Sequence, residues 1–597
     1  MVKPPSGENF LDVERSLLGK RWRTRLADAR LGMALAQRLN LPEIMGRVLA
    51  ARGVHPDEAE SFFEPTLKRL LPNPSHLKDM DRAVDRLAHA IRKGEKVAVF
   101  GDYDVDGATS SALLERFFRA AGASLRVYIP DRLKEGYGPN AEALLRLKGE
   151  DISVVVTVDC GATAFSPLEA AAKAGLDVIV VDHHIGEPKL PKAHAVINPN
   201  RLDEESPHRM LAAVGVAYLL VIALNRALRE AGWYKDRAEP DLLAWLDLVA
   251  LGTVCDVAPL TGLNRAFVAQ GLKIAAQRGN PGIAALMDVA RLETRPSAYH
   301  LGFLLGPRVN AGGRVGEAGI GAKLLATEDA FEARELAAHL DTLNAERKQI
   351  EAAVLDAAGE QIEREGGKGA IAFAAGEGWH PGVVGIVASR LRERYNRPAF
   401  VAALNKGMAT GSGRSVPGVD LGSAVLAARQ AGLVETGGGH AMAAGFTVKA
   451  EGIQDLKAFL DVRIATALEE AGFVPSLGFD GALTPAAATP EFVQLLERLS
   501  PFGPGNAEPR FAFANARIAF SEIVGEDHVR CMITDAEGGG RVKGIAFRSA
   551  DTELGRALLA KGRTSLHLAG HLRADHWQGR DDVQLFIEDA AIARPDA

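Results

Sequence analysis

Cysteine is scarce in this sequence. The 597 residues hold three, Cys160, Cys255 and Cys531, and their spacing matches no metal-binding motif. Scattered thiols exclude a disulfide framework and a thiolate zinc cluster, and a reducing cytoplasm is their simplest location. Long apolar runs are also missing: no stretch approaches the ~20 residues of a membrane span, and MVKPPSGENF lacks the apolar centre of a signal peptide. The sequence therefore predicts a cytoplasmic protein without a membrane segment.

An excess of positive charge is lacking as well. The chain carries 70 Lys and Arg against 76 Asp and Glu, a net charge of −6. Overall charge therefore does not indicate a nucleic-acid-binding protein, and any such binding must use local patches. GKRWRTRLADAR, residues 19–30, is one candidate patch, and an ordinary solvated surface is the alternative. The length allows about four domains of ~150 residues each.

Three acids alternate in the stretch KVAVFGDYDVDGATSSALLERFF, at Asp102, Asp104 and Asp106. Such a triplet can begin a calcium loop of the EF-hand type, which needs a Glu at its twelfth position and a helix before it. The twelfth position is Leu113, and KVAVF is a short β-branched run. Calcium is therefore excluded. The triplet is expected at the end of a buried strand, in the turn before a helix.

Strand-like runs alternate with helical ones from residue 96 to about residue 200. The runs KVAVF, SLRVYI, ISVVVTV, LDVIVV and AVIN are continuously apolar, which is typical of a parallel sheet covered on both faces. Helical stretches follow, and the chain up to about Thr327 is mixed and rich in glycine. From Thr327 to about Glu365 there is no Pro and no Gly except Gly359. A helix of that length spans about 50 Å and is interpreted as a connector, with a helix pair broken at Gly359 as the alternative.

The remaining chain has two further compositions. Strands and glycine-rich turns such as TGSGRSVPG and ETGGGHAMAAGF predict a second α/β lobe, and the short strands RFAFANARIAF, GRVKGIAF, TSLHLAGHLRA and DVQLFIEDAAI predict a small β-barrel or sandwich. The expected fold is therefore α/β with a C-terminal β-barrel. The expected parts are an N-terminal segment at 1–90, a parallel-sheet lobe at 91–326, a connecting helix at 327–366, the second lobe at 367–474 and the barrel at 475–597.

Acids and histidines recur at the ends of later elements. Asp159 follows SVVVTV, Asp182, His183 and His184 follow LDVIVV, and Asp256 lies after a helix in LVALGTVCDVAPL. Because parallel strands end at one edge of their sheet, we expect these side chains to converge with the triplet. Two divalent ions about 3.5 to 4 Å apart resolve the repulsion in so acidic a cluster. Oxygen and imidazole ligands without thiolate suit Mn²⁺ or Mg²⁺ and argue against structural zinc.

The motifs GDYDVDG, VDCG, DHH and GTVCDVAPL, in this order, resemble the DHH phosphoesterases. The later motifs GWHPGVVGIVASRL, GSGRSVPGVDLG, GGGHAMAAGF and SPFGPGNAEPRF extend the resemblance over nearly the whole chain, to the branch of single-strand-specific 5′→3′ DNA exonucleases. The resemblance implies a DHH lobe, a connecting helix, a DHH-associated lobe and an oligonucleotide-binding barrel.

The resemblance also implies roles for particular residues. Asp159 is expected to bridge two metal ions, and catalysis is expected from Asp159, Asp182 and His184, with His184 stabilising the phosphoryl oxygens or donating to the leaving group. Many family members have a His where this chain has Phe100, which leaves open whether Asp102 binds metal directly. The expected metal ligands are Asp102, Asp104, Asp106, Asp159, His183 and Asp256.

The substrate contacts expected from the resemblance lie in glycine-rich motifs. Ser412, Arg414 and His440 are expected to hold a 5′-terminal phosphate, since the glycines let backbone N–H groups approach an anion and Arg414 can bind it bidentately. A flexible turn is the alternative for GGGH. The motif GPRVNAGGR adds three expected contacts to the strand, Arg308, Asn310 and Arg314.

The prediction is two-metal hydrolysis of single-stranded DNA from its 5′ end to 5′-mononucleotides. The resemblance adds a role in recombination and repair, with a single-strand-binding protein and a helicase as partners. One alternative is a DHH phosphodiesterase for short oligonucleotides or dinucleotides, although a barrel with Arg541, Lys543, Arg573 and Trp577 favours a long polymer. The other alternative, a non-catalytic nucleic-acid-binding scaffold, is disfavoured because every expected ligand is present.

Overall fold

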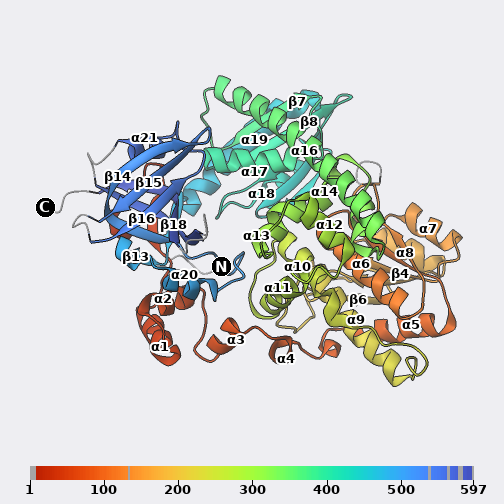
Figure 1. Ribbon diagram of the computed structural model, residues 1–597. Coiled ribbons are helices and arrows are strands. Elements are labelled where there is room, and N and C mark those ends of the chain that lie inside the picture. Colours follow the sequence, from red (N-terminus) through yellow and green to blue (C-terminus); the bar gives the residue numbers. More distant parts are fainter. Residues whose placement is uncertain (1–8, 132–134, 536–538, 561–564, 576–581, 594–597) are drawn as a thin grey trace. The chain divides into compact units, whose positions relative to one another are not determined.

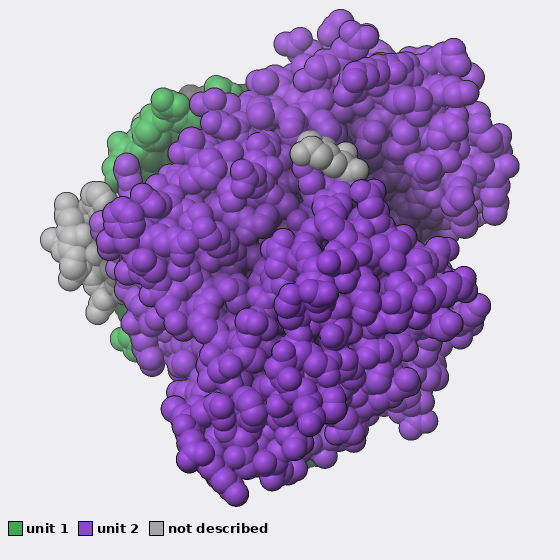
Figure 2. All heavy atoms as spheres, turned by 90° about the vertical axis from the view of Figure 1, so that its right-hand side faces the viewer, with its two compact units in different colours: residues 1–70, 259–265, 474–597 green, residues 71–258, 266–473 purple. Residues whose placement is uncertain are grey.

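The computed structural model describes residues 9–131, 135–535, 539–560, 565–575 and 582–593. The chain divides into two compact units, coloured separately in Figure 2. Unit 1 comprises residues 1–70, 259–265 and 474–597, and unit 2 comprises residues 71–258 and 266–473. Among the described residues, no helix is both long and apolar enough to cross a membrane.

Unit 2 contains a five-stranded parallel sheet in the order β3-β2-β4-β5-β6; its strands β4 and β6 are labelled in Figure 1. All four pairings are parallel, and β2 and β4 are buried along their whole length because helices cover both faces. The continuous Val/Ile runs had predicted this arrangement. The strands are β2 (Val97–Gly101), β3 (Leu125–Tyr128), β4 (Val154–Val158), β5 (Asp177–Val181) and β6 (Ala195–Ile197). The helices around them are α5 (Met80–Lys93), α6 (Val105–Ala120), α7 (Ala141–Gly149), α8 (Phe165–Lys173) and α9 (Ala213–Glu230).

The stretch before Thr327, which was expected to be mixed, is helical. Its glycines lie where neighbouring segments approach closely: a Cβ on Gly306 would lie 2.4 Å from Cys255 Sγ, and one on Gly321 would lie 2.8 Å from a methyl group of Val309. Tertiary packing thus outweighs the low helix propensity of glycine. The elements are α10 (Leu246–Cys255), α11 (Gly262–Ala275), α12 (Pro281–Val289), α13 (Ala298–His300), the π-helical turn η4 (Leu301–Leu305), α14 (Gly306–Val315) and α15 (Ile320–Ala326).

A single helix, α16 (Ala330–Arg364), leads to the second lobe of unit 2. Asp329 caps it, accepting hydrogen bonds from Phe331 N and Glu332 N. Gly359 does not break the helix; it is buried, and an added Cβ would lie 3.1 Å from Arg394 Nη1. The expectation of one long connecting helix is therefore confirmed over the helix pair.

The second lobe of unit 2 has a five-stranded mixed sheet in the order β10-β11-β9-β8-β7. Only the β7–β8 pair is parallel, and helices pack on the sheet. The elements are β7 (Ala372–Glu377), α17 (Val384–Tyr395), β8 (Ala399–Asn405), β9 (Met408–Arg414), α18 (Leu421–Gln430), β10 (Thr436–His440), β11 (Ala443–Lys449) and α19 (Ile453–Ala471).

Unit 1 is built on a closed barrel rather than a sandwich. Five strands follow the order β14-β15-β16-β18-β17, and β17 pairs back with β14. The short strand β13 (Gly481–Leu483) extends the sheet beside β14. The barrel strands are β14 (Phe511–Val524), β15 (His528–Thr534), β16 (Arg541–Ala546), β17 (Leu566–Asp575) and β18 (Asp582–Ile592), with α20 (Pro490–Glu497) and α21 (Glu553–Leu559) as helices.

Residues 1–70 belong to unit 1, together with residues 259–265 and 474–597. Strand β1 (Arg21–Thr24) pairs with β12 (Ser476–Phe479), and Leu35 of α1 (Ala29–Leu39) and Leu49 of α2 (Glu43–Ala51) lie in the core that fills the barrel. The candidate basic patch at 19–30 is partly structural, because Trp22 is fully buried there. The expected domain boundaries stay a prediction.

Candidate metal centre and anion site

The acid triplet lies between β2 and α6. Asp104 caps α6 and accepts a hydrogen bond from Gly107 N at 3.0 Å, and a Cβ on Gly107 would lie 2.3 Å from Asp102 O, so only glycine permits this turn. Asp106 lies inside the first turn of α6 and not in the turn before it. A strand end and a helix start together therefore point the three carboxylates toward one edge of the sheet.

Asp106 is held by the start of another helix. Its Oδ2 accepts from Ala213 N at 2.6 Å and its Oδ1 accepts from Val214 N at 2.8 Å, both at the N-terminus of α9. Complete burial and the nearby charge of Asp256 raise the pKa of Asp106 to about 7, against the lowering effect of the Val214 amide. A buried carboxylate under this electrostatic load is relieved by a cation.

Asp159 follows β4 in a left-handed backbone conformation, with φ of +61°. Asp and Asn adopt this conformation more readily than most residues. Burial and then the charges of Asp104 and Asp106 raise the pKa of the Asp159 carboxyl well above its usual value. A residue from another part of the chain holds the backbone of Asp159, because Tyr137 Oη donates to Asp159 O at 3.1 Å.

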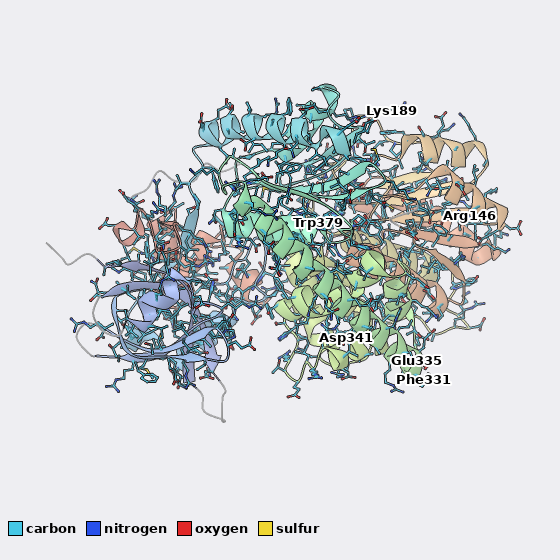
Figure 3. All side chains as sticks on the ribbon, turned by 90° about the horizontal axis from the view of Figure 1, so that it is seen from above. Arg146, Lys189, Phe331, Glu335, Asp341 and Trp379 are labelled. Atoms are coloured by element: carbon cyan, nitrogen blue, oxygen red, sulfur yellow. The ribbon has the colours of Figure 1, made fainter. Side chains whose placement is uncertain are left out.

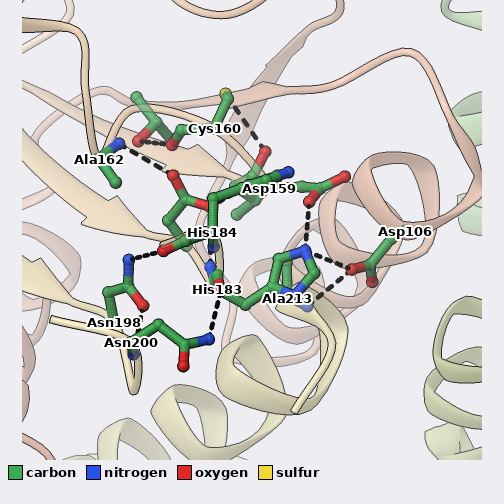
Figure 4. Close-up of polar contacts among 12 residues, drawn as sticks. Asp106, Asp159, Cys160, Ala162, His183, His184, Asn198, Asn200 and Ala213 are labelled. Carbon is green, nitrogen blue, oxygen red and sulfur yellow. Dashed lines mark hydrogen bonds and ion pairs between the residues drawn. The ribbon is translucent and has the colours of Figure 1, made fainter. Parts of the chain in front are cut away.

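His183 lies among three of the acids. Its Nε2 is 3.2 Å from Asp159 Oδ1 and 3.9 Å from Asp106 Oδ2 (Figure 4). Its Nδ1 is 3.8 Å from Asp256 Oδ2. Asp256 follows α10 directly, as expected, and burial and the charge of Asp104 raise its pKa to about 7. The convergence expected from parallel strand ends is thus present.

Asp182 is turned toward protein donors. Its Oδ2 accepts from Ala162 N at 2.9 Å, and its Oδ1 accepts from His183 N at 2.8 Å and is 2.7 Å from His184 Nδ1. Burial alone would raise the pKa of Asp182, but the bond with His184 outweighs it and the pKa falls to about 2. Burial opposes charge on His184 too, yet Asp182 raises the His184 pKa to about 9. The contacts of the Asp182 carboxylate are thus to Ala162 N, His183 N and His184.

Three residues that support the site were not foreseen. Asn198 Nδ2 donates to His184 O at 2.8 Å, and Asn200 donates to His183 O, so both histidines are held through their backbones (Figure 4). Asn198 directly follows β6, and the rule that strand ends share an edge applies to it as well. Tyr137 Oη lies 3.5 Å from His184 Nε2. Tyr137 does not follow a strand, so the sequence pattern could not have indicated this contact.

The side-chain donors form metal-binding groups within 4.8 Å of one another. Carboxylate and imidazole are the ligands expected for Mn²⁺ and Mg²⁺. His183 Nε2 supports this fit: it is buried and makes no hydrogen bond to any described residue. Cys160, next to Asp159, turns its Sγ to backbone oxygens and supplies no thiolate. The groups are Asp102, Asp104 and Asp159; Asp106, His183 and Asp256; and Asp159, His183 and His184.

Asp102 belongs to one of these groups although its strand carries Phe100 in place of histidine. Phe100 is fully buried in a core with residues of α7 and α8 and stacks on Tyr128, with ring centroids 5.3 Å apart. A core residue at position 100 thus leaves the donor atom of Asp102 beside those of Asp104 and Asp159.

A second site lies in unit 2 as a cleft of about 500 Å³. Ser412, Arg414 and Arg314 line it, together with a glycine-rich backbone. Arg414 Nη1 donates to Ser412 Oγ at 2.7 Å, and Gly385 leaves space for the guanidinium, since an added Cβ would lie 2.8 Å from Arg414 Nη2. The structure brings these three predicted residues together. His440 is exposed at the end of β10 and is not part of the lining.

The other predicted substrate residues have different surroundings. Arg308 Nε donates to Asp341 Oδ1 of α16 at 2.8 Å, which ties α14 to α16. Asn310 lies partly exposed on α14. In the barrel, Lys543 pairs with Asp575 and Arg573 pairs with Glu508. Arg541 is exposed at the start of β16, and Trp577 lies outside the described residues.

Three protein-family models match the chain. "DHH family, N-terminal domain" matches residues 96–253, "DHHA1 domain" matches residues 366–466, and "RecJ OB domain" matches residues 479–589. Acids and histidine at the edge of a parallel sheet, followed by an associated lobe, define a metal-dependent phosphoesterase of the DHH class.

Named relatives identify which family within the DHH class this chain is similar to. The single-stranded-DNA-specific exonuclease RecJ of Escherichia coli is 38% identical over 92% of this chain and 96% of the relative, and RecJ of Bacillus subtilis is 34% identical over 96% and 71%. The crystal structure of RecJ from Thermus thermophilus with Mn²⁺ superposes with a TM-score of 0.80, at 30% identity over 96% of this chain and 80% of that one. A structure of the same protein with Mg²⁺ gives 0.75 at 28%, over 96% and 79%. The chain belongs to the RecJ family.

Proposed function

We propose that this protein hydrolyses single-stranded DNA from its 5′ end and releases 5′-mononucleotides. The observation that carries the proposal is the pair of ligand groups around Asp159, Asp104 with Asp102 on one side and His183 on the other. The relatives reported above are named single-stranded-DNA-specific exonucleases, which supports the substrate class. Two Mn²⁺ or Mg²⁺ ions, when bound, supply an activated water and stabilise negative charge at the phosphate.

The side chains of the site have separate roles in binding, orientation and proton transfer. Asp159 belongs to two of the three ligand groups and joins them, and the amides of Ala213 and Val214 fix the orientation of Asp106. Asp182 is a positioning residue that holds the His184 ring in one orientation through Nδ1 and stabilises its protonated form. His184 Nε2 is then directed to the phosphate, where it stabilises phosphoryl oxygens or gives a proton to the departing 3′ oxygen.

The direction of cleavage follows from the anion cleft. Arg414 and Ser412 bind the 5′-terminal phosphate, and Arg314 is held at the rim by its bond to Gly382 O at 2.9 Å. We expect a 5′ end held in this cleft to present the next phosphodiester to the metal centre. Asn310 contacts the strand between the two sites, and Arg308 and His440 assist from the periphery.

The biological setting belongs to the same proposal. Acting on single strands, the enzyme would serve recombination and repair in the cytoplasm, beside a single-strand-binding protein that covers its substrate and a helicase that exposes it. Co-purification with either protein from a cell extract, with and without nuclease treatment, distinguishes a direct partner from one held through DNA.

The direct test is a substrate comparison with the purified protein and Mn²⁺. We expect 5′-phosphorylated single-stranded DNA to yield mononucleotides from its 5′ end, faster than duplex DNA and RNA. The Arg414→Ala variant should lose the preference for a 5′-phosphate while keeping cleavage of 5′-hydroxyl ends. Activity confined to dinucleotides would contradict the proposal and support the short-substrate phosphodiesterase; DNA binding without cleavage would support the scaffold.

A further inference from the structure

An exposed aromatic pair lies on unit 2 outside the residues assigned so far. Tyr299 and Phe303 are 57% and 69% exposed, and their rings stack with centroids 5.0 Å apart and an interplanar angle of 27°. Two large rings that stay this exposed beside each other offer a flat apolar surface to a ligand. Phe303 lies within the π-helical turn η4, a local irregularity that is frequent at functional sites.

The aromatic pair lies on the same helical face as Asn310 and Arg314 of α14, which are predicted to contact the DNA strand. Elements α13, η4 and α14 follow one another without a break from Ala298 to Val315, and steps of three or four residues along a helix stay on one face. The members of this face are at least partly exposed, whereas Leu305 and Val309 are buried. We define the 299–314 ridge as Tyr299, Phe303, Pro307, Asn310 and Arg314.

The helix that carries the ridge lies against the metal centre. A Cβ on Gly313 would be 2.8 Å from Tyr103 O, between two acids of the triplet, and one on Gly306 would be 2.4 Å from Cys255 Sγ, next to Asp256. From Arg314 to Phe303 the ridge rises about 16 Å at 1.5 Å per residue. That length matches about five nucleotides at ~3.4 Å each, and fewer if the strand is extended.

We propose that Tyr299 and Phe303 form a stacking platform for an unpaired base of the DNA strand, on the 3′ side of the cleaved bond. Arg314 lines the anion cleft that takes the 5′ end, so the opposite end of the ridge meets the strand a few nucleotides later. The proposal rests on the exonuclease function proposed above.

The charge on the preceding loop is compatible with a DNA strand as the occupant. Arg291 and Arg295 are exposed on the loop before α13, with Glu293 between them. Aromatic rings beside cations are the combination with which single-strand channels bind bases and backbone together. Stacking does not depend on base identity, which suits an enzyme that digests any sequence.

The test uses the full chain with Tyr299 and Phe303 both changed to Ala. Initial rates are measured with Mn²⁺ on 5′-phosphorylated oligonucleotides of two to twelve nucleotides. Loss of one stacked base costs affinity by roughly 5- to 150-fold, so kcat/KM on the twelve-nucleotide substrate should fall about 10-fold relative to the dinucleotide, mainly through KM. Tyr299→Phe keeps the ring and should keep the wild-type ratio. Phe331→Ala is the matched control, an equally exposed Phe near the start of α16 (Figure 3).

An abasic nucleotide identifies the interaction. Moved along the oligonucleotide, it should weaken wild-type cleavage at one position about three to five nucleotides from the 5′ end and have no further effect there in the double variant. An unchanged length ratio in the double variant, or equal losses on dinucleotide and long substrates, would overturn the platform while leaving the exonuclease intact. Failure of the wild type to digest single-stranded DNA would instead overturn the proposed function.

Discussion

The buried carboxyl group of Asp247 destabilises the fold when it is charged, so its effect on stability depends on pH. It lies in the first turn of α10, is 1% exposed, and its Oδ2 makes no hydrogen bond to a described residue. Burial raises its pKa from 3.8 to about 7, against the lowering effects of the Leu248 amide and Arg116. Arg116 compensates it little, because its guanidinium donates to the carbonyls of Leu325 and Thr327.

The raised pKa of Asp247 sets the direction in which the stability of the protein changes with pH. The folded protein favours the neutral acid, so the contribution of Asp247 to stability is full below the unfolded pKa and is lost as the pH rises through 7. At 1.36 kcal/mol per pKa unit the total is roughly 4 kcal/mol, of which about 2 to 3 kcal/mol falls between pH 5 and pH 8. Asp247→Asn removes the titration, so its stability relative to wild type should rise by that amount over the same interval.

Urea titrations at pH 5, 6, 7 and 8, in EDTA and followed by tryptophan fluorescence, measure this difference. Asn can add a constant cost of ~1–3 kcal/mol, because its amide group must find buried partners. That cost does not depend on pH, so only the slope is diagnostic. A stability difference that stays constant from pH 5 to pH 8 would show that Asp247 is charged at no cost, and would refute the reasoning.

Two further substitutions test the packing of unit 1 and the catalytic array. Asp480 is fully buried and pairs with Arg25 and Arg52; Asp480→Ala should lower the free energy of unfolding of unit 1 by about 3–5 kcal/mol in urea titrations, and a change below ~1 kcal/mol would contradict the pairing. Asp182→Asn should lower kcat on single-stranded DNA by roughly 10- to 100-fold with little change in KM, because His184 loses its orientation. A rise in KM at constant kcat would exclude this positioning role.

The position of the metal centre was predictable from local patterns. Val/Ile runs that end in Asp159 and in Asp182-His183-His184 indicate strand ends, and parallel strands must end at the same edge. The structure brings both ends together with the triplet, with His183 Nε2 3.2 Å from Asp159 Oδ1. The class of metal followed from the donor types alone.

What fixes those side chains was not predictable, because it comes from distant parts of the chain. Asp106 is held by amides of residues 213 and 214, which lie more than one hundred positions later. The left-handed backbone of Asp159 leaves no trace in VDCG, since Asp adopts ordinary conformations equally well.

A high glycine content wrongly predicted mixed structure in a segment where tertiary packing forms a helix. GPRVNAGGR has three glycines and a proline, yet residues 306–315 form α14 because Gly306 and Gly313 allow it to lie against Cys255 and Tyr103. The pairing of β1 with β12 joins residues about 450 positions apart, and nothing in either segment specifies the other.

Asp159 belongs to two of the three ligand groups and is expected to serve both in one catalytic centre. Asp159→Asn is the sharpest variant, because Asn tolerates the left-handed backbone there and loses only the charge. Cleavage of 5′-phosphorylated single-stranded DNA in Mn²⁺ should be abolished, while DNA affinity, measured with the same oligonucleotide, should persist because phosphate contacts elsewhere supply most of it. Turnover near the wild-type rate in this variant would contradict the account.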